Sequence, residues 1–228
     1  ILMKKAIIAI VASLFLSSYA LAGQMGFGVT GSLAAITGEG KEADKNGDTD
    51  TSGRTGTASN TAMIGSVFAE YSMDNGFTFG LDYIPGSADV SSSSLKRVDT
   101  TADGNEGTSD SGTRTAQAEV ENHYTYYVEI PVHNGVYAKG GYVEMDVNTL
   151  ESSTLTHSAT YGNTKVDGYQ YGVGYKSEFG TGSGYYKIEG THTEFDTLAI
   201  SGSTTDKGNK ITADLDVTKV TFALGFGF

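Results

Sequence analysis

Four oxygen-bearing side chains near the start of the chain have the spacing of a metal site. They stand at alternate positions: Asp44, Asn46, Asp48 and Asp50. Calcium loops begin with oxygen ligands at alternate positions and end with a bidentate glutamate at the twelfth. Thr55 holds that twelfth place, and no helical pattern flanks the segment. We therefore predict a solvated acidic loop and no specific metal site.

Histidine is the other residue type that could support a reaction. The chain has four histidines, at His123, His133, His157 and His192. A nucleophile and its base must come within hydrogen-bonding distance, and no serine, histidine and acidic residue have a spacing that forces this. We predict no catalytic residue, no cofactor and no enzymatic activity.

A third set of charged residues alternates with apolar ones, and it needs extended strands to position it. Side chains of a strand point to opposite faces in turn. If the aromatic faces point outward, seven charges point inward: Glu70, Asp82, Glu129, Lys176, Lys187, Glu189 and Lys219. Unpaired charge in a narrow, poorly hydrated interior is costly. We expect these groups to form ion pairs, with Glu70, Glu129, Lys176 and Lys187 in one layer.

The closing segment shows the strand pattern most clearly. One face is apolar and carries Val220, Phe222, Leu224, Phe226 and Phe228, while the other is small or polar. The same alternation predicts strands over residues 24–36, 61–73, 77–84, 118–130, 136–147, 166–176, 185–195 and 211–228. In the fourth of these strands we place Val120 outward. In the fifth we choose the outward phase that turns Glu144 and Asp146 inward, which puts outward Tyr137, Val143, Met145 and Val147. In the last we expect a bulge between Val217 and Val220.

The first 22 residues read as a cleaved secretory signal. Lys4 and Lys5 precede an apolar run, and small residues at Ala20 and Ala22 form a cleavage site. We thus divide the chain into a signal peptide, 1–22, and one domain, 23–228. Removing the signal leaves 13 basic against 27 acidic residues, a charge that argues against a nucleic-acid partner. The chain has no cysteine, so it has no disulfide framework.

The connections alternate in length along the chain. Long polar segments at 37–60, 86–117, 148–165 and 196–210 alternate with short turns at 74–76, 131–135 and 177–184. Bacterial barrels have short periplasmic turns and long outer loops. We predict an all-β fold: an eight-stranded antiparallel up-and-down transmembrane β-barrel with four long extracellular loops and three short periplasmic turns. A soluble up-and-down barrel is the alternative.

The chain resembles the small eight-stranded bacterial outer-membrane barrels related to the OmpA transmembrane domain, OmpX and the Opa proteins. The resemblance covers residues 167–228 and rests on the alternating apolar terminus at Phe228 and on segments 184–190, 193–196, 198–202 and 214–217. It implies that Val220, Phe222, Leu224, Phe226 and Phe228 form the signal read by the barrel-assembly machinery. The chain departs from the family in having Gly227 at the penultimate position and no C-terminal peptidoglycan-binding domain.

These observations together predict a non-enzymatic protein of the bacterial outer membrane. We expect a monomer that contacts lipid and lipopolysaccharide and presents acidic loops for envelope integrity or surface interaction, where an extracellular ligand or a phage could bind. A side-chain-filled lumen is expected for eight strands. A narrow passive porin-like channel is the first alternative, and a lipid-modifying barrel enzyme is the second.

Overall fold

The computed structural model describes residues 23–43, 54–89, 95–102, 109–154, 160–180, 183–202 and 210–228. The expected signal peptide and the Asp44–Asp50 segment lie outside these ranges, as does His157. The strands are β1 (Gly23–Ala43), β2 (Arg54–Met73), β3 (Thr78–Asp89), β4 (Leu95–Ala102), β5 (Ser109–His133), β6 (Val136–Ser153), β7 (Thr164–Phe179), β8 (Gly184–Phe195), β9 (Leu198–Ser201) and β10 (Lys210–Gly227). In this part of the chain no helix is long and apolar enough to cross a membrane.

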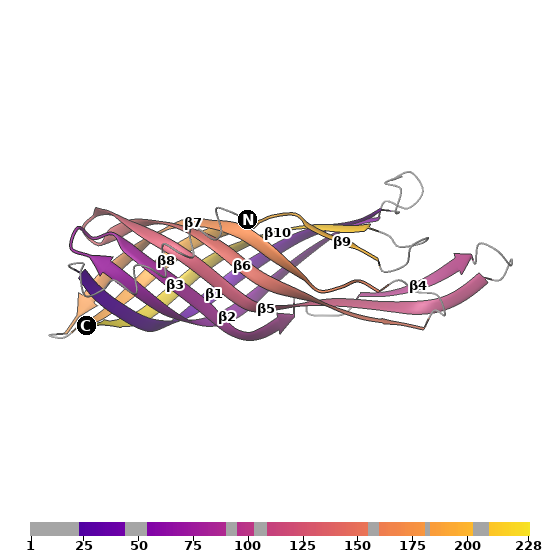
Figure 1. Ribbon diagram of the computed structural model, residues 1–228, viewed down its shortest axis with the longest axis horizontal. Helices are drawn as coiled ribbons and strands as arrows, with labels where there is room; N and C mark the ends of the chain where they lie inside the picture. The colour runs from indigo at the N-terminus through magenta and orange to yellow at the C-terminus, as the bar shows by residue number, and fades with distance from the viewer. Residues whose placement is uncertain are drawn as a thin grey trace.

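Eight of the strands form a closed antiparallel ring in the order β1, β2, β3, β5, β6, β7, β8 and β10. The ring closes where β10 pairs with β1, from Gly26 opposite Gly227 to Ala43 opposite Lys210. Each ring strand pairs with the ring strands before and after it in the chain, so the topology is up-and-down. The predicted eight-stranded barrel is confirmed (Figure 1).

The short turns lie together at one end of the ring, which we call the turn end. Asp74, Asn75 and Gly76 make the tight connection from β2 to β3, with Gly76 at a φ of 86° that suits glycine. Asn134 and Gly135 connect β5 to β6. The carboxyl terminus lies at this same end (Figure 1).

The opposite, loop end differs from the prediction, because strands continue where irregular loops were expected. Two paired sheets project past the ring (Figure 1). The first arm consists of the ends of β2, β1 and β10 with β9, and the second consists of β4 with the ends of β5 and β6. Most residues of these tracts are Ser, Thr, Gly or charged, although Leu198 and Leu215 pack against the buried cluster of Met145, Val147 and Val166. Backbone pairing extends the strands beyond that cluster, and threonine favours it.

Two of the predicted strand phases are wrong. Tyr137, Val143, Met145 and Val147 are buried and point into the ring, so Glu144 and Asp146 lie on the outside. Asp146 lies outside the ring near the loop end, where it forms an ion pair with Lys165 at 2.7 Å and accepts a hydrogen bond from the Asn122 amide. Val120 also points inward, because a bulge around Asn122, with a φ of 50°, reverses the phase of β5.

The expected bulge between Val217 and Val220 is absent from the described part of β10. Pairing to β1 runs without interruption from Val217 opposite Ile36 to Val220 opposite Leu33. The alternation therefore places Val217 on the inside with Lys219. The two apolar faces of this strand reflect an apolar upper lumen as well as an apolar exterior.

Candidate functional site in the barrel lumen

Charged side chains from five ring strands meet inside the barrel near the turn end. Glu70 of β2 is 1% exposed and Lys187 of β8 is 2% exposed, and the two form an ion pair. The Lys187 ammonium also donates to Glu129 Oε1 of β5 at 2.6 Å. Lys176 of β7 donates to the other oxygen of Glu70 at 2.9 Å. The structure thus brings together the four residues that were expected to share a layer.

A second ion pair lies beside the first. Lys139 of β6 donates to Glu189 Oε2 at 2.7 Å, and the Tyr137 hydroxyl donates to Glu189 Oε1 at 2.6 Å. The Lys139 ammonium lies 4.0 Å from the centroid of the Tyr127 ring, whose hydroxyl donates to Glu70. We call the four clustered charged residues and this second pair together the plug: Glu70, Glu129, Glu189, Lys139, Lys176 and Lys187. Its three carboxylates and three ammonium groups balance.

The space that small inward residues leave is filled by aromatic rings. Each large ring lies against the glycine directly opposite it on the neighbouring strand: Tyr127 against Gly80, Tyr137 against Gly174, Tyr185 against Gly225 and Phe68 against Gly28. A Cβ atom on Gly80 would come within 2.1 Å of the Tyr127 ring, and one on Gly174 within 2.3 Å of Tyr137. These glycines are therefore required for close approach, and they do not leave an open lumen.

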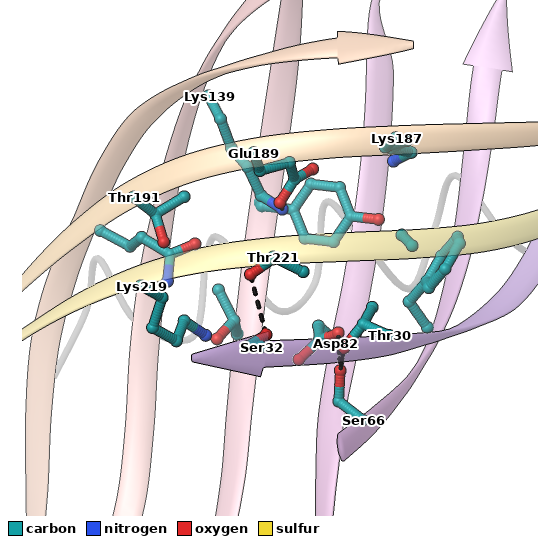
Figure 2. Close-up of a pocket in the computed structure, with 15 residues that line it drawn as sticks. Thr30, Ser32, Ser66, Asp82, Lys139, Lys187, Glu189, Thr191, Lys219 and Thr221 are labelled. Carbon is teal, nitrogen blue, oxygen red and sulfur yellow. Dashed lines mark hydrogen bonds and ion pairs between the residues drawn. The ribbon is translucent and has the colours of Figure 1, made fainter. Parts of the chain in front are cut away.

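Above the plug, toward the loop end, is a layer of hydroxyl groups with one carboxylate, Asp82, and one ammonium group, Lys219. Figure 2 shows Ser32 bonded to Thr221, at 2.8 Å, and Ser66 donating to Asp82, at 2.6 Å. Lys219 lines the same space. The free volume enclosed there is about 20 Å³. That volume holds about one water molecule.

Most of the inward charged residues were predicted from the sequence, whereas the aromatic residues and glycines around them were not. Glu70, Asp82, Glu129, Lys176, Lys187, Glu189 and Lys219 all line or enter the lumen, as the alternation indicated. Lys139 and Tyr137 were missed because the phase of β6 was assigned the wrong way round. The glycine–aromatic pairs depend on cross-strand register, which no single strand reveals. The signal available in the sequence was the presence of large aromatic residues and of glycines on the inward faces of the strands, as with Tyr127 and Gly80.

The other candidate residues lie apart from the plug. His192 points outward on β8, where its Nδ1 lies 2.9 Å from the Thr218 hydroxyl and its ring lies 5.4 Å from that of Tyr171. His133 is exposed at the end of β5. Among the residues described, no group of three or more His, Asp or Glu is arranged to hold a metal.

The outside of the ring is apolar. Large hydrophobic side chains are exposed on it around the circumference, among them Phe27, Val29, Leu33, Met63, Val67, Val173, Ile188, Val220, Phe222, Leu224 and Phe226. Outward aromatic rings contact one another, as Phe27 does with Phe226 and Phe228. A closed ring satisfies its backbone groups internally, and such an exterior suits hydrocarbon rather than water.

The chain was compared with known proteins. No protein-family model and no curated protein sequence match it. Among solved structures, it is similar to the outer membrane protein OprG from Pseudomonas aeruginosa, at 10% identity and a TM-score of 0.41, over 91% of this chain and 98% of that one. It is similar to the outer membrane protein AlkL in lipid bilayers, at 10% identity and a TM-score of 0.42, over 91% of each chain. It is also similar to the outer membrane protease OmpT from Escherichia coli, at 10% identity and a TM-score of 0.41, over 93% of this chain and 100% of that one.

The chain folds as an eight-stranded antiparallel up-and-down β-barrel with an apolar exterior. The apolar outer faces of its ring strands suit contact with lipid, and the plug lies inside the ring.

Proposed function

We propose that the barrel is a non-conducting, non-enzymatic scaffold that presents two acidic sheet arms at the cell surface. One observation carries this proposal: a balanced set of six charges crosses the lumen and leaves about 20 Å³ of space above it. An aqueous channel needs a continuous file of water along the axis. A space for about one water molecule does not provide that file.

The energetics of the plug favour a permanently closed lumen. Lys187 contacts two carboxylates at once, and Glu70 accepts from Lys187, Lys176 and Tyr127. Opening a path would separate buried charges, which is costly in a poorly hydrated interior. The lumen of the scaffold is thus a core that holds the ring together.

The arms are the part of the scaffold that a surface partner would meet. A shallow groove on the first arm is lined by three carboxylates, Glu39, Asp214 and Asp216, with the hydroxyls of Thr37, Thr57 and Ser59. Such a surface suits cationic groups of an extracellular ligand, or divalent ions bridging it to the phosphates of lipopolysaccharide. The arms would serve surface interaction or envelope integrity.

Recording from the purified barrel in a planar lipid bilayer tests the closed lumen. We expect no discrete conductance steps from the wild type. The double variant Lys139→Ala, Glu189→Ala removes one ammonium and one carboxylate together, so the charge balance is kept while the plug is thinned. Steps from the double variant alone would show that the plug closes the lumen. Steps from the wild type would establish the porin-like channel instead.

Cysteine labelling on intact cells tests the orientation of the arms. The chain has no cysteine, so a single Thr57→Cys substitution on the exposed first arm gives one reactive site. We expect a membrane-impermeant maleimide to label it on whole cells. Asp74→Cys at the exposed turn end is the matched control and should react only after the outer membrane is permeabilised. The reverse pattern would overturn the surface role.

A further inference from the structure

The wall of the barrel is interrupted between β2 and β3. Within residues 54–89, pairing of these strands runs only from Ser72 opposite Thr78 to Val67 opposite Tyr83. Beyond that point β2 continues to Arg54 in contact with β1, and β3 continues to Asp89 in contact with β5. The two strands therefore diverge toward the loop end and leave a lateral gap.

Local sequence causes this divergence. Pro85 has no backbone N–H to donate to a neighbouring strand, and Gly86 has a φ of 87°, which glycine tolerates and other residues rarely adopt. The register of β3 against β5 shifts between Ile84 and Ser87, directly opposite the bulge at Asn122. Bulges are enriched next to functional sites, where they redirect side chains or end pairing.

Behind the gap is a mostly apolar cavity of about 210 Å³. Inward side chains line it from around the ring, among them Ile36, Ile64, Ile84, Val120, Met145, Phe195, Leu215 and Val217. Met63 and Gly65, which face outward on β2, line it as well. Because both faces of β2 contribute, the cavity passes through the wall at the gap.

The mouth of the cavity faces lipid. Met63 is 87% exposed on the outer surface. A shallow groove on that surface shares Met63, Ile64 and Gly65 with the cavity and continues over Leu33, Val220 and Phe222. The stacked rings of Tyr83 and Tyr124, 4.7 Å apart, lie where the pairing ends.

The floor of the cavity is closed. Lys219 lines both this cavity and the small polar space above the plug, so the apolar region ends there. His123 also lines it, and its buried Nδ1 has no hydrogen-bond partner among the described residues. Asp89 and Glu121 lie at its loop-end rim. A molecule inside would have an apolar body in contact with aliphatic side chains and polar groups only at the ends.

We propose that the barrel binds a small apolar molecule in this cavity, and that the molecule enters from the lipid through the gap between β2 and β3. An apolar cavity of about 150 Å³ in another protein binds benzene, so the volume here suits a molecule of one substituted ring or a comparable hydrocarbon. Dissolution in lipid supplies such a molecule at the mouth without passage through water. This binding is separate from the closed axial lumen, because the plug lies beneath the floor.

Photolabelling in lipid nanodiscs tests the site and its entrance. The probe is 3-trifluoromethyl-3-phenyldiazirine, an apolar single-ring compound, and mass spectrometry locates its insertion. We expect the probe to label the inward residues Met145 and Val217, and excess toluene to reduce that label to a plateau. The probe should also label the lipid-facing Val173, and toluene should not reduce that label in a saturable way. Insertion confined to lipid-facing residues would overturn the proposal.

Two glycines give a matched pair of variants for the entrance. Gly65 at the mouth has only the Thr30 carbonyl, at 3.8 Å, near the position of an added Cβ, and Gly190 on β8 has nothing within 4 Å. We expect Gly65→Trp to lower label on Met145 and Val217 by about tenfold, because the indole ring would fill the mouth that Gly65 lines. Gly190→Trp, which faces outward away from the gap, should leave it unchanged.

Folding of each variant is checked by heat-modifiable migration on a gel. If Gly65→Trp does not fold, Met63→Trp blocks the same mouth at a side chain that is already exposed. Interior label that survives the folded entrance variant would refute entry through the gap. Axial conductance of the wild type would contradict the closed lumen without affecting this result, so the two proposals fail separately.

Discussion

Replacing Lys187 by methionine should lower the stability of the folded barrel more than most single substitutions in the lumen. The ammonium of Lys187 is 2% exposed and contacts both Glu70 and Glu129. Glu70 would keep Lys176 and Tyr127, but among the described residues Lys187 is the only side chain that hydrogen-bonds to the Glu129 carboxylate. Removing one member of a buried ion pair leaves an uncompensated charge and costs about 3–5 kcal/mol.

Lys165→Met provides the matched control for this change. Lys165 also forms an ion pair at 2.7 Å, with Asp146, but its side chain is 69% exposed. An exposed pair contributes about 0–1 kcal/mol. The same substitution at the two sites therefore separates the effect of burial from the effect of removing a lysine.

The measurement is urea unfolding of the barrel folded into lipid vesicles. The chain has no tryptophan, so unfolding is followed by far-ultraviolet circular dichroism and by heat-modifiable migration. The free energy of unfolding comes from the midpoint and the slope, and an unchanged slope shows that the variants differ in stability alone.

A second substitution tests whether the cost arises at Glu129. In Lys187→Met, Glu129→Gln the stranded carboxylate becomes a neutral amide of similar shape, and Glu70 keeps Lys176. We expect the double variant to recover about 2 kcal/mol or more, a coupling typical of residues in one network. A Lys187→Met barrel as stable as the Lys165→Met control would refute the reasoning about the plug.

Three further outcomes are expected. Gly80→Ala should cost about 1–3 kcal/mol in the same unfolding assay, because its Cβ would collide with the Tyr127 ring, whereas Gly140→Ala, with nothing within 4 Å, should cost under about 0.5 kcal/mol. Val173→Arg, at an outward side chain that is 63% exposed, should lower the free energy of unfolding in vesicles by about 2–4 kcal/mol, and Tyr169→Arg nearer the loop end should lower it by about 0–1 kcal/mol; equal costs would place the hydrocarbon elsewhere. Deleting Phe228 removes two backbone hydrogen bonds to Met25 at the closing seam, so less heat-modifiable barrel should form in cells; undiminished assembly would count against a terminal signal.

The parts of the fold that the sequence predicted are those in which one strand face is uniformly apolar. The closing strand and the β2–β3 hairpin have that property, and so the ring and most inward charges could be predicted from alternation alone. The phase of β6 could not, because at the loop end its inward face is apolar while its outward face carries Glu144 and Asp146. Choosing carboxylates for the lumen failed there, since Asp146 reaches Lys165 outside the ring instead.

The register between strands is the information that a single sequence lacks. Tyr127 lies against Gly80, and Tyr137 against Gly174, only because those residues are directly opposite in the sheet. The extended arms escaped prediction for a different reason. Backbone pairing stabilises them with little buried apolar surface, so they leave little periodic apolar pattern to detect.

Val120, which was predicted to point outward, points inward and lines the cavity. The bulge at Asn122 that turns this side chain inward lies opposite the Pro85–Gly86 break in β3, and β2 loses its partner at the same place. One local irregularity therefore supplies an apolar wall residue and the opening beside it. An unpaired strand edge near hydrocarbon carries a cost, since lipid offers no hydrogen bonds. A barrel that served only to anchor its arms would gain nothing from that cost, whereas a barrel that admits a molecule from the lipid requires it.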